Sequence, residues 1–393
     1  MNQPLPSRWP AYLCAFAAAF DNFAMTPLVR AIAVDMKVDL AEATAVASSY
    51  YLAYGLMQVP WGLASERLGR VTVMRLALAA GTLGAVASVL SSTLQGLLIA
   101  RFVAGAGMAA VVPAVIAWLG DALPLGERMK AATEMNAFYA LGAAAGVLGA
   151  GLLADDFGWA TGFAVSGALI VLALGGTALL FAPPKPAQPG SLMEALKYGD
   201  VRWLAAIAAV EGSVLFGLFA FLAPTMLQTG ATARTTGLVI AGYGVSVVVW
   251  SRVARWLGAR IVPMKAMAFG GVLMVLAWSA VALSPAAPGI FTASILMGAT
   301  IVFLHAQLQV WATQAAPTSR GPGIAMFSGS LFIGASLGTA FARPLFAEGM
   351  VRWLFAGGAG LAALVTATVL WRRRVTEARV SAAPSRDARG GPR

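Results

Sequence analysis

Long runs of apolar residues, separated by short polar segments, recur along the whole chain. Each run holds about 20 residues, which is the length that an α-helix needs to cross the hydrocarbon core of a bilayer. The runs lie at residues 9–34, 43–63, 71–90, 94–118, 129–153, 159–181, 201–227, 236–257, 262–283, 289–313, 324–346 and 353–371. The pattern therefore predicts an all-α integral membrane protein with twelve transmembrane helices.

The composition favours a membrane protein and argues against a soluble domain. Of the 393 residues, 59% are hydrophobic and 11% are charged, whereas soluble domains are roughly 45–50% apolar. A chain this apolar could not cover its core with polar surface in water, so we expect the lipid bilayer to surround it. The first run carries Asp21 near its middle and is too long for a signal-peptide core, so we expect it to remain as the first span.

The placement of the net charge of +11 predicts the topology. Most of the 27 lysines and arginines fall in alternate loops and in the C-terminal tail. Basic loops stay in the cytoplasm, which predicts a multi-pass protein of the cytoplasmic (inner) membrane with both termini cytoplasmic. Because topology accounts for the basic residues, we expect no nucleic-acid partner.

Internal repeats indicate a duplicated unit of six spans. Two sets of residues recur 189 and 192 positions later: Tyr54-Gly55, Trp61 and Leu68-Gly69 as Tyr243-Gly244, Trp250 and Leu257-Gly258, and Gly142 and Gly146 as Gly334 and Gly338. A Pro-rich polar segment separates the copies. We predict an N-terminal six-helix half (1–182), a cytoplasmic linker (183–200), a C-terminal six-helix half (201–371) and a disordered basic cytoplasmic tail (372–393).

A short charged hairpin at residues 62–75 carries a recognisable motif. Its sequence, GLASERLGRVTVMR, resembles the Gly-x-x-x-Asp-Arg-x-Gly-Arg-Arg signature of the major facilitator superfamily of secondary transporters. Gly62, Arg67, Gly69 and Arg70 match, Glu66 replaces the aspartate, and Val71 replaces the last arginine. The resemblance implies two pseudo-symmetric six-helix bundles that bind a solute between them near the middle of the membrane.

The same resemblance implies a cytoplasmic gate. In the superfamily the hairpin acid faces the cytoplasmic end of span 11, and the basic residue after the second glycine meets an acid at the end of span 4. Here those residues would be Glu66 for the first contact, and Arg70 with Asp121 for the second. The predicted gate consists of Gly62, Glu66, Arg67, Gly69, Arg70 and Asp121.

Asp21 and Arg101 are candidates for proton coupling. Asp21 lies ~18 Å along the first span, where an unpaired charge costs several kcal/mol, so it must face protein or a wet cavity. Its surroundings resemble the first-span motif of proton-driven exporters, in which an acid precedes a proline. Arg101 and Gly105 resemble the fourth-span motif, whose arginine tunes nearby protonation. The alternative is that both charges serve packing alone.

Glu211 and His305 are the other candidates for proton coupling. Glu211 lies in the seventh span and could hold a proton or meet a cationic substrate; the alternative is a carboxylate bonded to helix backbone. His305, the only histidine, shares a helix face with Gln309 and titrates near neutrality. The alternative for His305 is an ordinary hydrogen-bonding core residue.

Polar and aromatic side chains on the central spans are predicted to line a substrate cavity. Each could equally serve helix packing, and Arg30 could instead reach the lipid headgroups. The predicted cavity residues are Arg30, Tyr51, Tyr54, Asn136, Tyr139, Phe216 and Phe219.

No motif for enzyme chemistry, a metal or a cofactor was found, so we predict a transporter that is not an enzyme. The expected function is proton-coupled efflux of a small organic solute by alternating access, with protons and the solute as partners and a monomeric state. The alternatives are proton-linked uptake of a small organic anion and a membrane sensor that transports nothing. Glycines near Gly146 resemble the fifth-span motif of antiporters, but Val147 replaces its proline.

Overall fold

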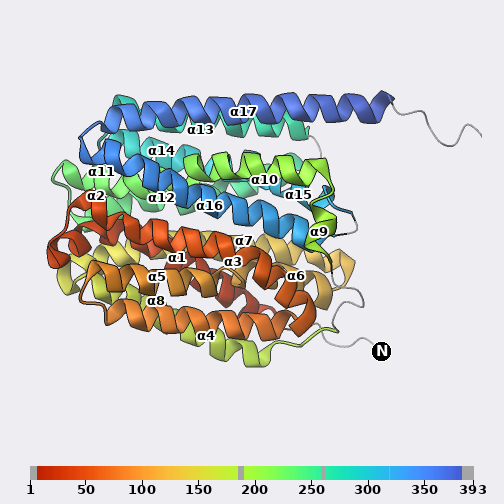
Figure 1. Cartoon of the computed structure of the whole chain (residues 1–393), viewed down its shortest axis with the longest axis horizontal. Helices are drawn as coiled ribbons and strands as arrows, with labels where there is room; N and C mark the ends of the chain where they lie inside the picture. The colour runs from red at the N-terminus through yellow and green to blue at the C-terminus, as the bar shows by residue number, and fades with distance from the viewer. Residues whose placement is uncertain (1–6, 185–189, 259–261, 318, 383–393) are drawn as a thin grey trace, which may run out of the picture.

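The computed structural model describes residues 7–184, 190–258, 262–317 and 319–382, and these form a bundle of nearly parallel helices (Figure 1). The helices are α1 (Trp9–Met36), α2 (Leu40–Ala43), α3 (Ala45–Leu68), α4 (Arg70–Val89), α5 (Leu94–Met108), α6 (Val111–Ala122), α7 (Leu125–Phe157), α8 (Trp159–Gly176), η1 (Thr177–Leu179), α9 (Leu192–Ala195), α10 (Gly199–Gly212), η2 (Ser213–Gly217), η3 (Phe219–Phe221), α11 (Leu222–Gln228), α12 (Ala233–Leu257), α13 (Pro263–Leu283), α14 (Ala287–Thr300), η5 (Ile301–His305), α15 (Ala306–Gln314), α16 (Arg320–Ala347) and α17 (Val351–Ala382).

The predicted all-α membrane architecture is confirmed. Within the described residues, 11 helical stretches are long and apolar enough to cross a membrane. The remaining predicted span corresponds to α3, which has 24 residues but carries serines, tyrosines, Gln58 and Glu66 that reduce its hydropathy. Helix α3 packs on α5 and on α16, so protein rather than lipid covers much of its polar surface.

Three spans are interrupted near their middle. The stretch Leu94–Ala122 consists of α5 and α6, Gly199–Gln228 runs from α10 to α11, and Ala287–Gln314 runs from α14 to α15. Two of these interruptions, η2 and η5, are π-helices of five residues. Single π-helical turns inside longer helices are frequent at functional sites.

The helices pack into two groups that meet along two seams. Helix α1 lies against α7 and α8, and α4 lies against α5 and α8, whereas α10 packs on α16 and α13 packs on α14 and α17. The pairs α3–α16 and α7–α12 join the first six spans to the last six. We call the end of the bundle that carries α9 and the start of α1 the linker face, and the end that carries α2 and α11 the far face (Figure 1).

The repeated glycines make equivalent contacts in the two groups. A Cβ added at Gly142 or Gly146 would collide with the carbonyl oxygens of Phe16 and Phe20 in α1. At the repeat positions Gly334 and Gly338 the added Cβ would collide with α10 and η2. Close backbone approach therefore explains both glycine pairs, as a duplicated unit requires. The division into halves at the stated boundaries stays a prediction.

The predicted linker and tail both contain helix. The linker segment 183–200 includes α9 and the first two residues of α10, while 185–189 lie outside the described residues. The tail predicted as disordered from residue 372 begins instead as a continuation of α17 to Ala382, and 383–393 lie outside the described residues. Arginine, glutamate and alanine are good helix formers, and Arg372 Nη2 lies 2.7 Å from Asp200 Oδ1, which anchors the extension to α10.

Substituting Gly146 with alanine should destabilise the protein, because the new Cβ would lie 2.5 Å from the Phe20 carbonyl oxygen. We expect a loss of about 1–3 kcal/mol, typical of overpacking, measured as a lower melting temperature in detergent. Gly149→Ala is the control, since its Cβ would lie 3.6 Å from the Phe20 ring. Equal melting of the two variants would contradict the close-approach explanation.

Candidate functional site

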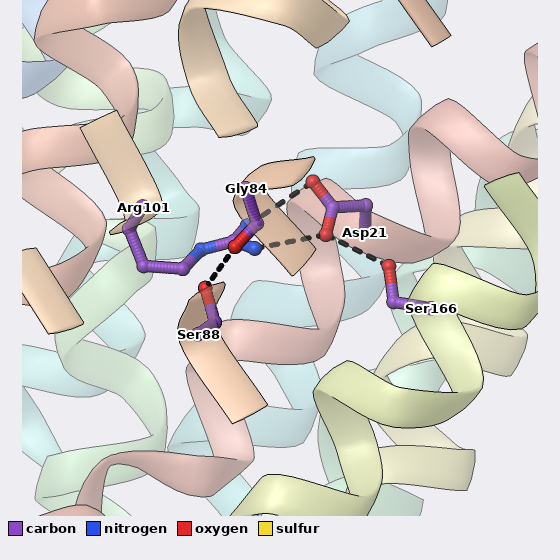
Figure 2. A network of polar contacts seen from close by, with 5 residues as sticks. All are labelled: Asp21, Gly84, Ser88, Arg101 and Ser166. Atoms are coloured by element: carbon purple, nitrogen blue, oxygen red, sulfur yellow. Dashed lines mark hydrogen bonds and ion pairs between the residues drawn. The ribbon is translucent and has the colours of Figure 1, made fainter. Parts of the chain in front are cut away.

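Asp21 and Arg101 form an ion pair in the interior of the first group of helices (Figure 2). Arg101 Nη1 donates to Asp21 Oδ1 over 3.0 Å, and Nη2 donates to Oδ2 over 3.1 Å. Ser166 of α8 donates a third hydrogen bond, 2.7 Å long, to Oδ1. The pair therefore joins α1, α5 and α8, and both charged side chains are completely buried.

Aromatic rings enclose the guanidinium of Arg101. Its Cζ lies 4.7 Å from the ring centres of both Tyr50 and Phe163, close enough for cation–π attraction. Gly105, one turn further along α5, approaches the Tyr50 carbonyl so closely that a Cβ would collide with it. Small residues in α5 thus let α3 approach the pair and exclude water from it.

This geometry gives both oxygens of the Asp21 carboxylate a hydrogen-bond donor. Two parallel hydrogen bonds from a guanidinium and one from a hydroxyl stabilise a carboxylate, and an arginine side chain does not lose its proton. A proton can reach Asp21 only if the pair opens, because a neutral carboxyl group would leave Arg101 buried without a counter-charge. Asp21 and Arg101 must therefore be treated as one unit.

Glu211 and His305 form a second buried pair, in the last six spans. His305 Nδ1 lies 3.1 Å from Glu211 Oε1; the Glu211 side chain is completely buried and that of His305 is 13% exposed. The other carboxylate oxygen, Oε2, is buried without a hydrogen-bond partner. The partner of the buried carboxylate is thus a histidine here and an arginine in the Asp21–Arg101 pair.

Both members of this second pair lie at π-helices. Glu211 is two residues before η2, and His305 is the last residue of η5. The His305 ring also packs on Phe327, with the ring centres 5.8 Å apart. The sequence identified both residues but did not indicate that they meet, because the π-helical turns that bring them together leave no clear mark in the hydropathy pattern.

Four predicted cavity residues join an aromatic cluster between the two groups of helices. Tyr51, Tyr54, Phe216 and Phe219 are buried and contact further rings rather than open space. The Tyr54 and Phe332 ring centres are 4.2 Å apart, and those of Phe216 and Phe332 are 5.4 Å apart. We call the set of Phe23, Tyr51, Tyr54, Phe216, Phe219, Tyr243 and Phe332 the aromatic cluster.

The remaining predicted cavity residues lie at the margins of this cluster. Tyr139 is half-buried on α7 and Asn136 is exposed. Arg30 is exposed near the far face, where its Nη1 donates a 3.5 Å hydrogen bond to the Ala231 carbonyl. It therefore links α1 to the segment before α12 and does not approach the ion pair of α1.

The hairpin residues meet the linker segment and α16. The Glu66 Oε2 atom accepts a 2.5 Å hydrogen bond from the Gly190 backbone N–H, and its other oxygen lies against Gly321 in the first turn of α16. Arg70 Nε lies 3.0 Å from Asp121 Oδ2, and Arg70 Nη1 reaches Ser65. Gly69 has a positive φ of 96° between α3 and α4, a conformation that favours glycine.

Gly62 and Arg67 complete the predicted gate. Gly62 faces Ala325 of α16, which a Cβ would approach to 3.2 Å, and Arg67 lies exposed in the last turn of α3.

A further ion pair lies at the linker face, where Arg8 Nη2 is 2.7 Å from Glu127 Oε2. This contact lowers the pKa of Glu127, so the ion pair stabilises the linker face at neutral pH and weakens as the pH falls into the carboxyl range.

Several residues at the site escaped the sequence analysis. Ser166 and Phe332 carry no local signal in their apolar spans. Tyr243 is the repeat counterpart of Tyr54, so the duplication could have identified it. Asn22 follows Asp21 directly, and its buried Oδ1 has no hydrogen-bond partner. In the described residues, no group of three or more His, Cys, Asp or Glu side chains could hold a metal ion.

Comparison with known proteins identifies the family of the chain and several related transporters. The model of the Major Facilitator Superfamily matches residues 11–222. The chain is 31% identical over 194 residues to the 4-hydroxybenzoate transporter PcaK of Pseudomonas aeruginosa, a match covering 47% of this chain and 42% of PcaK. It is 27% identical over 137 residues to a triacylglyceride transporter of Mycolicibacterium smegmatis, covering 34% and 24%. The chain thus spans less than half the length of these relatives.

Two solved structures resemble nearly the whole chain. The POT family transporter PepTSo has a TM-score of 0.77 at 14% identity, with 96% of this chain and 99% of that chain covered. A D-xylose–proton symporter has a TM-score of 0.71 at 15% identity, with 91% and 96% covered. At these identities the likeness concerns the fold alone, and it agrees with the predicted fold class.

Breaking the Asp21–Arg101 pair from one side should cost more than removing both charges. Asp21→Asn is expected to destabilise the protein by about 3–5 kcal/mol, because it leaves a buried cation without a counter-charge. The double variant Asp21→Asn/Arg101→Gln should recover part of this loss in thermal melting in detergent. Ser166→Ala, which removes one hydrogen bond, serves as the mild control at about 1 kcal/mol. Strictly additive losses would refute the coupling.

Proposed function

The chain belongs to the major facilitator superfamily of small-solute transporters, and we propose that it couples movement of a small organic solute to protons. The supporting observation is the Glu211–His305 contact, a buried carboxylate beside a side chain that titrates near neutrality. A proton gradient can drive transport only through groups that bind and release protons between the two orientations of the site, and this pair meets that requirement.

The Asp21–Arg101 pair is the second proposed coupling element. Asp21 accepts a proton only when Arg101 finds another counter-charge, so its protonation depends on rearrangement of α1 against α5. Uptake of one proton by Glu211 and a neutral His305, in contrast, needs no separation, because it leaves no buried cation without a counter-charge. We therefore propose that Glu211 and His305 exchange protons readily, whereas Asp21 is protonated only in a conformation in which α1 and α5 have rearranged.

The proposed solute site is the aromatic cluster. Its rings come from α1, α3, η2, η3, α12 and α16, so a solute held there would touch both groups of helices. Stacked rings favour a planar aromatic solute, and each aromatic contact contributes about 0.5–1.5 kcal/mol. A solute would have to separate rings that now touch, which ties binding to movement of one group against the other.

Export is the proposed direction, on the strength of the first- and fourth-span motifs around Asp21 and Arg101. Uptake of an aromatic acid is the second candidate, because a relative 31% identical over 194 residues is a 4-hydroxybenzoate transporter. An anionic solute would need a positively charged side chain at its site. The two arginines predicted for that role already have partners, because Arg101 is paired with Asp21 and Arg30 donates to the Ala231 carbonyl.

The hairpin is the proposed cytoplasmic gate. Glu66 joins α3 to the linker at Gly190 and to the start of α16, and Arg70 joins α4 to Asp121 of α6. A negative charge at a helix N-terminus is favourable, so Glu66 latches the two groups at this end. The proposal takes the linker face as cytoplasmic, with both termini on that side of the inner membrane and a division into halves at residues 183–200.

Proton coupling is tested in proteoliposomes that carry a pH gradient, with ethidium and 4-hydroxybenzoate as probe solutes. Glu211→Gln should lower pH-driven flux at least about tenfold, because an amide cannot carry a proton, while solute exchange without a gradient persists. Asp21→Asn should likewise lose pH-driven flux. Glu348→Gln, at an exposed carboxylate of the far face, is the control and should resemble the wild type.

The outcomes separate the candidates. Outward movement of ethidium against its gradient supports export, and inward accumulation of 4-hydroxybenzoate supports uptake. Full pH-driven flux in Glu211→Gln would remove this pair from the coupling mechanism, and binding of solute without flux would indicate a sensor.

Charge reversal at Glu66 should open the linker face. We expect Glu66→Lys to raise the ratio of open to closed populations about tenfold, since a charge-assisted contact of about 1.4 kcal/mol is lost. Spin labels at Lys130 and Gln314, which are exposed on α7 and α15, report the distance across this face in a variant without Cys14. Glu42→Lys at the far face is the control. An unchanged distance distribution would leave Glu66 as a topology signal only.

A further inference from the structure

An apolar groove lies on the outer surface of the last six spans, away from the aromatic cluster. It has a volume of about 490 Å³ and is lined by α10, η2, α16 and α17, with Ser213 as its polar exception among the described lining residues. Along α16 it extends from Gly334 to Leu345, which is about 16 Å at 1.5 Å per residue. One leaflet of the hydrocarbon core is about 15 Å thick, so the groove matches a single acyl chain in length.

A polar pocket adjoins the groove at the far face. It has a volume of about 530 Å³ and is lined by the end of α11, by Pro285 and by the turn from Gly349 to Trp353. Trp353 lines both the pocket and the groove, so the two adjoin at this residue. Of the described residues lining the pocket, Arg352 alone is charged.

The pocket contains the N-terminus of a long helix that lacks a capping side chain. The Met350 carbonyl accepts the first helical hydrogen bond of α17, from Leu354 N–H, which makes Met350 the N-cap residue. A methionine side chain cannot accept bonds from the first N–H groups of the helix, which have no partner within it. The start of a helix with free N–H groups attracts anions, and Arg352 adds a full positive charge.

A buried hydroxyl provides an independent sign of a ligand. Thr225 lines the pocket and is 2% exposed, yet its Oγ1 has no hydrogen-bond partner. Threonines elsewhere in the spans donate to a nearby carbonyl, as Thr229 does to Met226 and Thr339 does to Ala335. A buried hydroxyl without a partner is costly, and a turn of the Thr225 side chain toward the pocket would let a polar group there satisfy it.

We propose that the groove and pocket together bind one anionic phospholipid of the far-face leaflet. Its phosphate lies at the start of α17 beside Arg352 and Thr225, and one acyl chain occupies the groove. A second copy of this protein would cover the groove with an apolar helix face but would leave the charged pocket unfilled. The proposal is independent of the transported solute, because this site lies outside the aromatic cluster.

The test uses the delipidated full-length protein in detergent, with retained lipid counted by native mass spectrometry. Dioleoylphosphatidylglycerol should bind as one tightly held molecule, and dioleoylphosphatidylcholine, which has the same chains but no net charge, should bind more weakly. Glycerol 1-phosphate, which lacks the chains, should not compete at equal concentration. If glycerol 1-phosphate did compete, the site would recognise the phosphate group alone and not the whole lipid.

Matched variants separate the two parts of the site. Arg352→Gln should weaken phosphatidylglycerol binding at least about tenfold, and Arg343→Gln, at an exposed arginine that lines neither cavity, should not. Gly357→Leu should fill the groove and weaken both lipids, because an added Cβ meets nothing within 4 Å there. Gly360→Leu has the same open surroundings but lies outside the groove, so it is the control.

Three results would overturn the proposal. The first is that Arg352→Gln and Gly357→Leu both retain phosphatidylglycerol as the wild type does. The second is that the control variants Arg343→Gln and Gly360→Leu lose as much phosphatidylglycerol as these two variants do. A dimer that forms without lipid and dissociates in Gly357→Leu would instead identify the groove as a contact between copies.

Discussion

The buried charge pair of Asp21 and Arg101 sets conditions that much of the first six helices must meet. Two ions can remain in an apolar interior only if their geometry is good and water is excluded. Ser166 supplies the extra hydrogen bond, Tyr50 and Phe163 cover the guanidinium, and Gly105 lets α3 come close. Helices α1, α3, α5 and α8 thus all contribute contacts to one ion pair, although Arg101 Nε is buried without a hydrogen-bond partner.

The two halves of the chain solve the same problem with different chemistry. Both hold a carboxylate in the interior of a span, but one partner is an arginine and the other is a histidine. An arginine side chain keeps its charge in proteins, whereas histidine is the side chain best suited to proton exchange. The glycine contacts with α1 and α10 are thus alike in the two groups of helices, while the buried ionisable groups differ.

Much of the fold was predictable because each span must bury its own backbone hydrogen bonds in a long apolar run. Asp21, Arg101, Glu211 and His305 also stood out, since charged residues are rare inside spans. The sequence did not show how these residues pair, because the pairing depends on which helix faces meet. The aromatic cluster shows the same limit: Tyr51 and Phe216 could be named as central residues, but only the three-dimensional arrangement reveals that their rings touch Phe332.

The π-helix η2 also fixes which side chains share a face. In an α-helix, residues five positions apart point about 140° away from each other, and the wider π-helical turn, with its i→i+5 hydrogen bonds, reduces this angle. Phe216 follows Glu211 by five positions, across Ser213–Gly217. The wide turn therefore sets the angle between the carboxylate and the aromatic ring, and deleting a single residue there would turn the ring by about 100° relative to the acid.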